Sequence, residues 1–82
     1  MIDDVKATVA SVLQLGKRAE KMNERTPLLG AIPELDSMAV VSVITALEER
    51  FSITIEDDEI GADAFETLGS LASFVQRKVQ DR

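Results

Sequence analysis

The residues of this sequence best placed to do chemistry are a consecutive aspartate and serine, Asp36 and Ser37. Asp36 suits the N-cap of a helix, because its carboxylate can accept hydrogen bonds from the free backbone N–H groups of the first turn. Ser37 would then be the first helical residue, with its hydroxyl in solvent near the positive end of the helix dipole. That position favours a phosphate ester by roughly 0.3–1 kcal/mol. The pair alone also fits ordinary helix initiation, since both residue types are common caps.

The composition excludes several other kinds of active site. The 82 residues include no cysteine and no histidine, which rules out disulfides, thiol catalysis, histidine-based triads and histidine metal sites. The acidic run at residues 56–59 does not match a calcium-binding EF-hand loop, so we expect no dedicated metal site. We therefore expect the reactive group of this protein to be added to the chain.

The serine must be positioned by a helix over residues 37–51. Apolar side chains recur there at helical spacing, at Val40, Val43, Ile44, Leu47 and Phe51. Similar stripes predict helices over residues 2–15 and 68–79, the latter capped by Thr67, and a short helix over residues 57–65. Gly16 is expected to follow the end of the first helix, although apolar spacing continues to Met22. A long loop at residues 23–35 and an extended stretch after Phe51 complete an all-α chain.

The net charge of −6 is concentrated near the serine. Residues 34–66 hold ten acidic side chains and one basic, whereas residues 1–33 hold four acidic and five basic. Such a field repels nucleic acid and attracts basic protein surfaces. No stretch approaches the ~20 apolar residues of a membrane span, so we expect a soluble, cytoplasmic protein. We also expect a monomer.

The longer pattern around the serine resembles the acyl carrier proteins and related phosphopantetheine carrier domains. The similarity rests on the sequence LDSM at residues 35–38, ALEERF at 46–51, Ile53, Ile55, the acidic run, and TLGSL at 67–71, and it extends over about residues 28–79. It implies one carrier domain over residues 1–82, folded as a small four-helix bundle with three longer helices and a short third one.

The resemblance also implies a mechanism shared with partner enzymes. A phosphopantetheinyl transferase, using coenzyme A and Mg²⁺, would attach a 4′-phosphopantetheine arm to Ser37, with Asp36 presenting the serine and contacting the metal of the transferase. The thiol of the arm would carry acyl groups as thioesters in fatty-acid or specialised lipid or polyketide-like biosynthesis. The protein would then be a freestanding carrier and a substrate of other enzymes, with no catalytic residue of its own.

Departures from the family pattern leave two alternatives open. Leu35 and Met38 replace a common Gly and Leu, and Ala39 and Ser42 occupy places where fatty-acid carriers usually have carboxylates. The protein could accordingly be an aminoacyl or D-alanyl carrier served by an adenylating ligase. In a different class, it could be an acidic helical adaptor that is never modified.

Two groups of residues are candidates for contacts beyond the attachment site. The first would dock basic patches on ligases, synthases or acyltransferases, and comprises Met38, Val41, Glu48, Glu49, Asp57 and Asp58. The second would line a pocket for an acyl chain, and comprises Val43, Leu47, Phe65, Leu71 and Val75. Each member of the second group fits an ordinary core position equally well.

Overall fold

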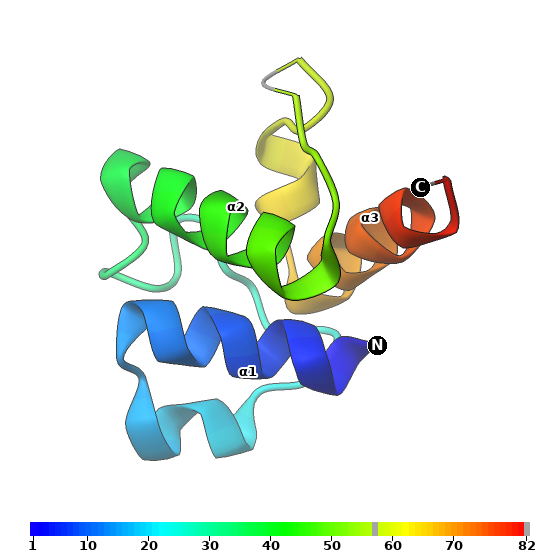
Figure 1. Cartoon of the computed structure of the whole chain (residues 1–82). Coiled ribbons are helices and arrows are strands. Elements are labelled where there is room, and N and C mark those ends of the chain that lie inside the picture. Colours follow the sequence, from blue (N-terminus) through cyan, green and yellow to red (C-terminus); the bar gives the residue numbers. More distant parts are fainter. Residues whose placement is uncertain (57, 82) are drawn as a thin grey trace.

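The computed structural model describes residues 1–56 and 58–81, and the regular elements within these ranges are all helical (Figure 1). Three are α-helices: α1 at Ile2–Leu13, α2 at Ser37–Phe51 and α3 at Leu68–Asp81. Two are short 3₁₀ helices, η1 at Gly16–Lys21 and η2 at Ala62–Phe65. The all-α fold predicted from the sequence is confirmed. None of the described helices is long and apolar enough to cross a membrane.

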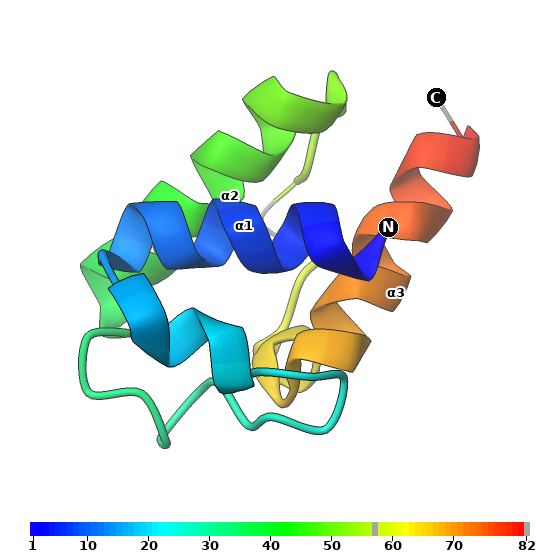
Figure 2. The ribbon, with the colours of Figure 1, turned by 90° about the horizontal axis from the view of Figure 1, so that it is seen from below.

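Helix α1 lies at the centre of the packing. It contacts both α2 and α3, while η2 packs against α3 (Figures 1 and 2). Aliphatic side chains dominate the core, in keeping with a sequence that has only three phenylalanines and no other aromatic residue. The largest fully buried side chains are Leu28, Leu47, Leu68, Leu71, Val5, Val9, Val43 and Val75. Because α2 contributes only Val43 and Leu47 to its fully buried face, its opposite side remains available to solvent.

The first helix ends earlier than predicted. Gln14 adopts the left-handed conformation with φ 55° and caps α1, so the helix stops at Leu13. Gly16, expected directly after the helix end, instead begins η1 with φ 58°. The apolar spacing that continued to Met22 reflects burial of Leu15 and Met22 on either side of this 3₁₀ turn.

The segment predicted as a helix over residues 57–65 is helical only at its end. Gly61 is extended at the N-cap of η2, which covers just Ala62–Phe65, while Asp57 lies outside the described residues. The predicted inward position of Phe65 is confirmed, since it is 3% exposed. Helix α3 continues to Asp81, two residues further than predicted.

The predicted cap of α3 is confirmed and is reciprocal. The Ser70 backbone N–H donates to Thr67 Oγ1 at 3.0 Å, and the Thr67 N–H donates to Ser70 Oγ at 3.0 Å. Each residue satisfies a donor that the first helical turn leaves free. The cap therefore fixes where the chain enters α3.

The long loop before α2 is held by backbone pairing with the chain that enters α3. Residues 24–29 and 65–69, which we call the clasp, exchange four hydrogen bonds and contain an antiparallel bridge between Pro27 and Thr67. Leu28 N–H donates to Glu66 O at 3.1 Å, Leu29 to Phe65 O at 2.9 Å, Leu68 to Thr26 O at 2.9 Å and Gly69 to Glu24 O at 2.9 Å. The clasp satisfies backbone groups that a structureless loop would leave to water.

Candidate functional site

The site is built at the start of α2. Asp36 is extended, with φ −96° and ψ −175°, and its Oδ1 accepts a hydrogen bond from the Ala39 N–H at 2.8 Å. Its carbonyl oxygen accepts the first helical bond, from the Val40 N–H at 2.9 Å. The predicted N-cap is confirmed, and Ser37 is the first helical residue, exposed to solvent.

The surroundings of Ser37 suit a phosphodiester but not self-activation. Among the described residues, the backbone N–H groups of Ser37 and Met38 have no hydrogen-bond acceptor, as expected for a first helical turn. These donors and the helix dipole favour an anion at this end of α2. The neighbouring carboxylate, Asp36, is engaged in the cap through Oδ1, and its Oδ2 has no hydrogen-bond donor among residues 1–56 and 58–81. The site can thus present a hydroxyl and tolerate a phosphate on it.

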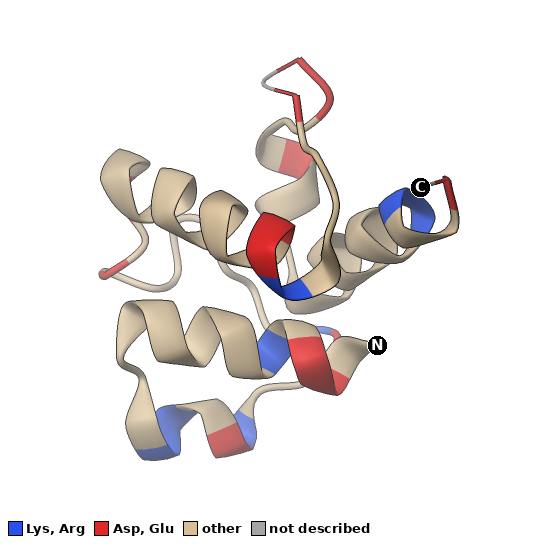
Figure 3. Cartoon of the chain, in the orientation of Figure 1, with Lys and Arg blue, Asp and Glu red and all other residues tan. Residues whose placement is uncertain are grey.

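The outward side of α2 beyond the serine is neutral. Met38 is 74% exposed and Val41 is 57% exposed, and the next outward positions, Ser42 and Thr45, are uncharged. Figure 3 shows the charged residues of α2 confined to its C-terminal end. There Glu49 is exposed, but Glu48 is half-buried, and its Oε2 accepts the Ile55 N–H at 2.8 Å.

Ion pairs brace the segments on both sides of α2. Arg18 of η1 contacts Glu34, two residues before the cap, at 2.7 Å, and Lys78 of α3 contacts Glu59, ahead of η2, at 2.6 Å. The hydrogen bond from Arg18 holds the pKa of the Glu34 carboxyl below its ordinary value, and Lys78 does the same for the pKa of Glu59. Both carboxylates therefore favour the charged form.

An apolar groove opens between α2 and η2. Its volume is about 240 Å³, and its lining is Leu29, Val40, Ile44, Ile60, Gly61, Ala62 and Phe65. At 1.5 Å per residue, Val40 and Ile44 lie only about 5 and 10 Å along the helix from Ser37. The clasp anchors the other wall, because the Leu29 N–H bonds to Phe65 O. The groove thus begins within about one helical turn of the serine along α2.

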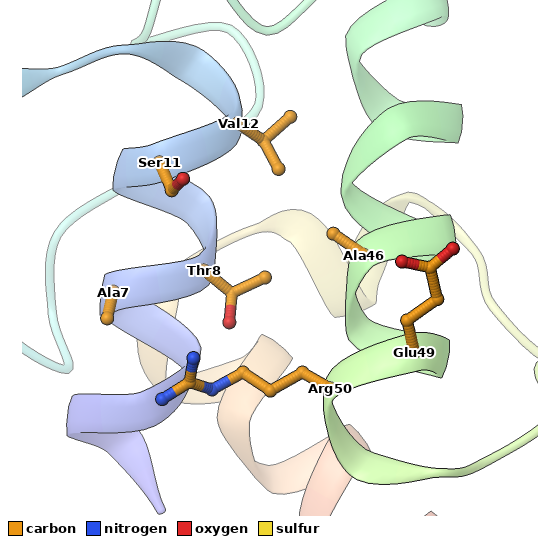
Figure 4. Close-up of a pocket in the computed structure, with 7 residues that line it drawn as sticks. All are labelled: Ala7, Thr8, Ser11, Val12, Ala46, Glu49 and Arg50. Atoms are coloured by element: carbon orange, nitrogen blue, oxygen red, sulfur yellow. The ribbon is translucent and has the colours of Figure 1, made fainter.

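A second hollow lies between α1 and α2 (Figure 4). Its volume is about 370 Å³, and its lining is Ala7, Thr8, Ser11, Val12, Ala46, Glu49 and Arg50. The Arg50 side chain extends from α2 toward α1, where it pairs with Asp4 at 3.2 Å. Ala46 stands nine residues beyond Ser37, about 14 Å along the helix. The larger hollow is therefore more polar and farther from the serine than the groove.

Comparison with known proteins identifies the family of the chain. The family model described as "Phosphopantetheine attachment site" matches residues 3–75. The chain belongs to this phosphopantetheine carrier family. It is 38% identical over 79 residues to an acyl carrier protein of a Sulfurovum species, covering 93% of this chain and 95% of the relative. It is also 35% identical over 75 residues to a D-alanyl carrier protein of Streptococcus suis, covering 88% and 91%.

A solved structure extends the family assignment to the fold. The chain is similar to the solution NMR structure of a holo acyl carrier protein from Nitrosomonas europaea, with 54% identity and a TM-score of 0.90, over 96% of this chain and 95% of that one. The acyl-carrier type of helical bundle expected from the sequence is therefore confirmed, and phosphopantetheine is the prosthetic group of the family.

The carrier fold distributes the predicted pocket residues unevenly. Phe65 lines the groove, whereas Val43, Leu47, Leu71 and Val75 are each 0% exposed and lie in the closed core. Sequence reasoning missed the other six groove residues as pocket lining, of which the four large ones are Leu29, Val40, Ile44 and Ile60. Val40 and Ile44 belong to the apolar stripe that the sequence predicts for α2, so that stripe is the signal that could have located them. Leu29 and Ile60 lie in loops, where only the fold shows which apolar side chains meet.

The predicted docking residues divide into three groups. Met38, Val41, Glu49 and Asp58 are exposed, as a contact surface requires. Glu48 is committed to the Ile55 N–H, so at most one of its oxygens is free. Asp57 lies outside the described residues. Within residues 1–56 and 58–81, no three carboxylates are placed to hold a metal ion together.

Proposed function

We propose that Ser37 Oγ carries a 4′-phosphopantetheine arm, and that the protein transports acyl groups as thioesters on the terminal thiol of this arm. The observation that carries the proposal is an exposed serine at the first position of a capped helix, in a chain of the phosphopantetheine carrier family. A phosphopantetheinyl transferase would supply the arm from coenzyme A. Ser37 Oγ would bond to the phosphorus, the adenosine bisphosphate would leave, and the serine proton would pass to a base on the transferase.

The residues of the chain itself have presenting roles in this scheme. Asp36 fixes the start of α2, and its Oδ2 is available to the Mg²⁺ of the transferase. The N–H groups of Ser37 and Met38, which have no acceptor within the described part of the chain, favour the resulting phosphodiester. Among the described residues, no side chain forms a hydrogen bond with the Ser37 hydroxyl, and in this proposal the transferase supplies the base while the chain serves as its substrate and as a shuttle.

The apolar groove between α2 and η2 is the proposed binding site for the acyl chain. An apolar cavity of about 150 Å³ already accommodates benzene, and the groove measures about 240 Å³. Each methylene buried there contributes roughly 0.8 kcal/mol. The proximity of Val40 and Ile44 to Ser37 supports this role over the hollow between α1 and α2. The pathway served is proposed to be fatty-acid or specialised lipid or polyketide-like biosynthesis.

A D-alanyl or other aminoacyl carrier is the second candidate. Two observations favour it: the D-alanyl carrier relative from Streptococcus suis and the neutral outward side of α2, where Ser42 and Thr45 are uncharged. Such a carrier would be loaded by an adenylating ligase and would not need the groove. Loading assays with acyl and aminoacyl ligases separate the two candidates.

The attachment itself is tested by intact mass. The protein is incubated with coenzyme A, Mg²⁺ and a broad-specificity phosphopantetheinyl transferase, beside Ser37→Ala and the matched control Ser42→Ala, an exposed serine of the same helix. We expect wild type and Ser42→Ala to gain one phosphopantetheine and Ser37→Ala to gain none. A wild type that gains nothing, with a transferase that modifies a control carrier, would favour the unmodified adaptor.

We also propose that residues 1–82 work as one carrier domain. The shared core of α1, α2 and α3 and the family match over residues 3–75 support this. A monomeric state and a cytoplasmic location stay predictions from the sequence.

A further inference from the structure

One wall of the groove is held differently at its two ends. This wall consists of residues 60–65, which we call the η2 wall. At its C-terminal end, Ala64 O accepts a hydrogen bond from the Ser70 hydroxyl at 2.9 Å. Next to it, Phe65 O accepts the Leu29 N–H of the clasp, also at 2.9 Å. Two hydrogen bonds to backbone carbonyls therefore fix this end of the wall.

The N-terminal end of the η2 wall is tethered by an ion pair. Ile60 lines the groove, and the preceding residue, Glu59, contacts Lys78 of α3 at 2.6 Å through Oε2. Within residues 1–56 and 58–81, this contact is the only hydrogen bond or ion pair that joins residues 59–62 to another helix. The side chains of Glu59 and Lys78 are 34% and 22% exposed, so water competes for the contact. A single breakable contact thus holds the end of the wall that carries Ile60.

The η2 wall has open space on both of its sides. On one side lies the groove of about 240 Å³. On the other side, where η2 packs against α3 (Figure 1), lies a hollow of about 340 Å³ that borders Asp63 of the wall and Arg77 of α3. Gly61, the extended residue before η2, lines both spaces. Ile60 can therefore shift away from α2 and enlarge the groove without displacing the buried core.

We propose that the ion pair between Glu59 and Lys78 limits the length of acyl chain that the groove accepts, because it holds Ile60 in place. This inference rests on the proposed function, in which the arm on Ser37 delivers an acyl chain to the groove. A chain too long for the closed groove displaces Ile60, and Glu59 then leaves the position in which it meets Lys78. Glu59 and Lys78 are thus positioning residues that act on the acyl chain through Ile60.

The volume of the groove and the strength of the ion pair give the expected limit. A cavity of about 150 Å³ holds the six carbons of benzene, so by proportion the groove of about 240 Å³ has room for about ten carbons. An ion pair at a surface contributes at most about as much free energy as one buried methylene. Removal of the pair should therefore extend the accepted chain by about two carbons, which is one step in a series of even-numbered chains.

The test measures how Tm depends on the length of the attached chain. A broad-specificity transferase loads the full-length protein from acyl-coenzyme A with saturated groups of increasing even carbon number, and intact mass verifies each product. Lys78→Met removes the charge and keeps an apolar stem, whereas Lys78→Arg keeps the charge. Asp4→Asn is the matched control, because it breaks the ion pair with Arg50, and neither of these residues lines the groove. Each acyl form is compared with the holo form of the same variant, so a general loss of stability cancels.

We expect two patterns among these proteins. In wild type, Asp4→Asn and Lys78→Arg, the increase in Tm over the holo form should grow with chain length up to about ten carbons and then stop growing. In Lys78→Met, the increase should continue to grow for about two more carbons. A change in the stability of the fold alone would alter the Tm of each holo form and leave the chain length at the plateau unchanged.

Amide hydrogen exchange of the holo proteins gives a second, local readout. The Ala64 N–H is bonded to Gly61 O at 3.1 Å, at the tethered end of the η2 wall, and it should exchange about two- to fivefold faster in Lys78→Met than in wild type. The Leu29 N–H, bonded to Phe65 O at the fixed end, should exchange at the same rate in both proteins.

The results distinguish failure of this inference from failure of the proposed function. If Lys78→Met reaches its plateau at the same chain length as wild type, or if Asp4→Asn extends the accepted chain equally, the inference about the ion pair is overturned and storage of acyl chains in the groove stands. If correctly loaded wild type shows no increase in Tm at any chain length, storage in the groove is overturned. Absence of loading, or loading of Ser37→Ala, would overturn the attachment at Ser37.

Discussion

Replacing Gly69 by alanine tests whether the clasp stabilises this bundle. Gly69 is the second residue of α3, and its N–H donates to Glu24 O at 2.9 Å. A Cβ on Gly69 would lie 2.7 Å from Glu24 O and 3.1 Å from Glu24 Cβ, closer than side-chain carbons approach backbone oxygens. The loop must therefore move away from α3, and the hydrogen bond between them must weaken or break.

Opposing effects determine the size of the change. Alanine in place of glycine favours a helix by up to about 1 kcal/mol. Forced overpacking costs about 1–3 kcal/mol, and loss of the hydrogen bond adds about 0.5–1.5 kcal/mol. The expected net result is a loss of about 2 kcal/mol in the free energy of unfolding. For a domain of this size that corresponds to a fall of roughly 8–16 °C in Tm.

Thermal and urea unfolding followed by circular dichroism measure the effect, with Ser73→Ala as the control. Ser73 is an exposed residue of the same helix, so its replacement changes helix propensity without a clash. Hydrogen exchange gives a local readout, because the amide of Leu28, bonded to Glu66 O, should exchange faster in Gly69→Ala. If Gly69→Ala is as stable as wild type, or more stable, the clasp can move to admit the added Cβ without lowering the free energy of unfolding. That result would refute this reasoning.

Three further predictions concern the cap, the groove and the ion pairs. Asp36→Ala should lower the free energy of unfolding by about 1 kcal/mol in thermal melts, because the Ala39 N–H loses its acceptor, whereas Asp36→Ser should retain most of the stability. The protein loaded with a long acyl chain should have a higher Tm than the unloaded holo protein. Ala62→Phe, which fills the groove, should remove that increase in Tm. Equal Tm values for the two wild-type forms would contradict storage of the acyl chain in the groove. Lys78 lowers the pKa of Glu59 in the folded protein. The ion pair therefore stabilises the fold at pH values above the ordinary glutamate pKa of about 4.3, and this stabilisation is lost as the pH falls through the lower pKa of Glu59 in the folded state. The Tm gap between wild type and Glu59→Gln should accordingly narrow as melts are repeated at falling pH, and a constant gap would contradict the assignment.

The parts of the fold that depend on local chemistry could be predicted from the sequence. Asp36 caps α2 and Thr67 caps α3, because each side chain needs only backbone groups within three residues. The apolar stripe of α2 was equally readable, since helical spacing brings Val43 and Leu47 to one face. The cap and the apolar stripe together predict that Ser37 lies at the start of the helix, and no knowledge of the remaining chain is needed.

The parts that depend on contacts distant in sequence could not be predicted. The groove brings together Leu29, Ile44 and Ile60 from three segments, and no spacing rule connects them. The clasp uses backbone N–H and carbonyl groups, which every residue but proline offers, so it has no side-chain signature. The sequence predicted a helix over residues 57–65, but extended Gly61 confines η2 to the last four residues of that segment.

The clasp also has a consequence for how the protein folds. Pro27 and Thr67 are about forty residues apart, so their pairing closes a ring of chain that contains all of α2. Closing a flexible loop of that length costs about 3 kcal/mol of chain entropy, whereas a helix of this size forms locally within about a microsecond. The helix that bears Ser37 can therefore form early, but its place in the bundle depends on a slower, non-local encounter.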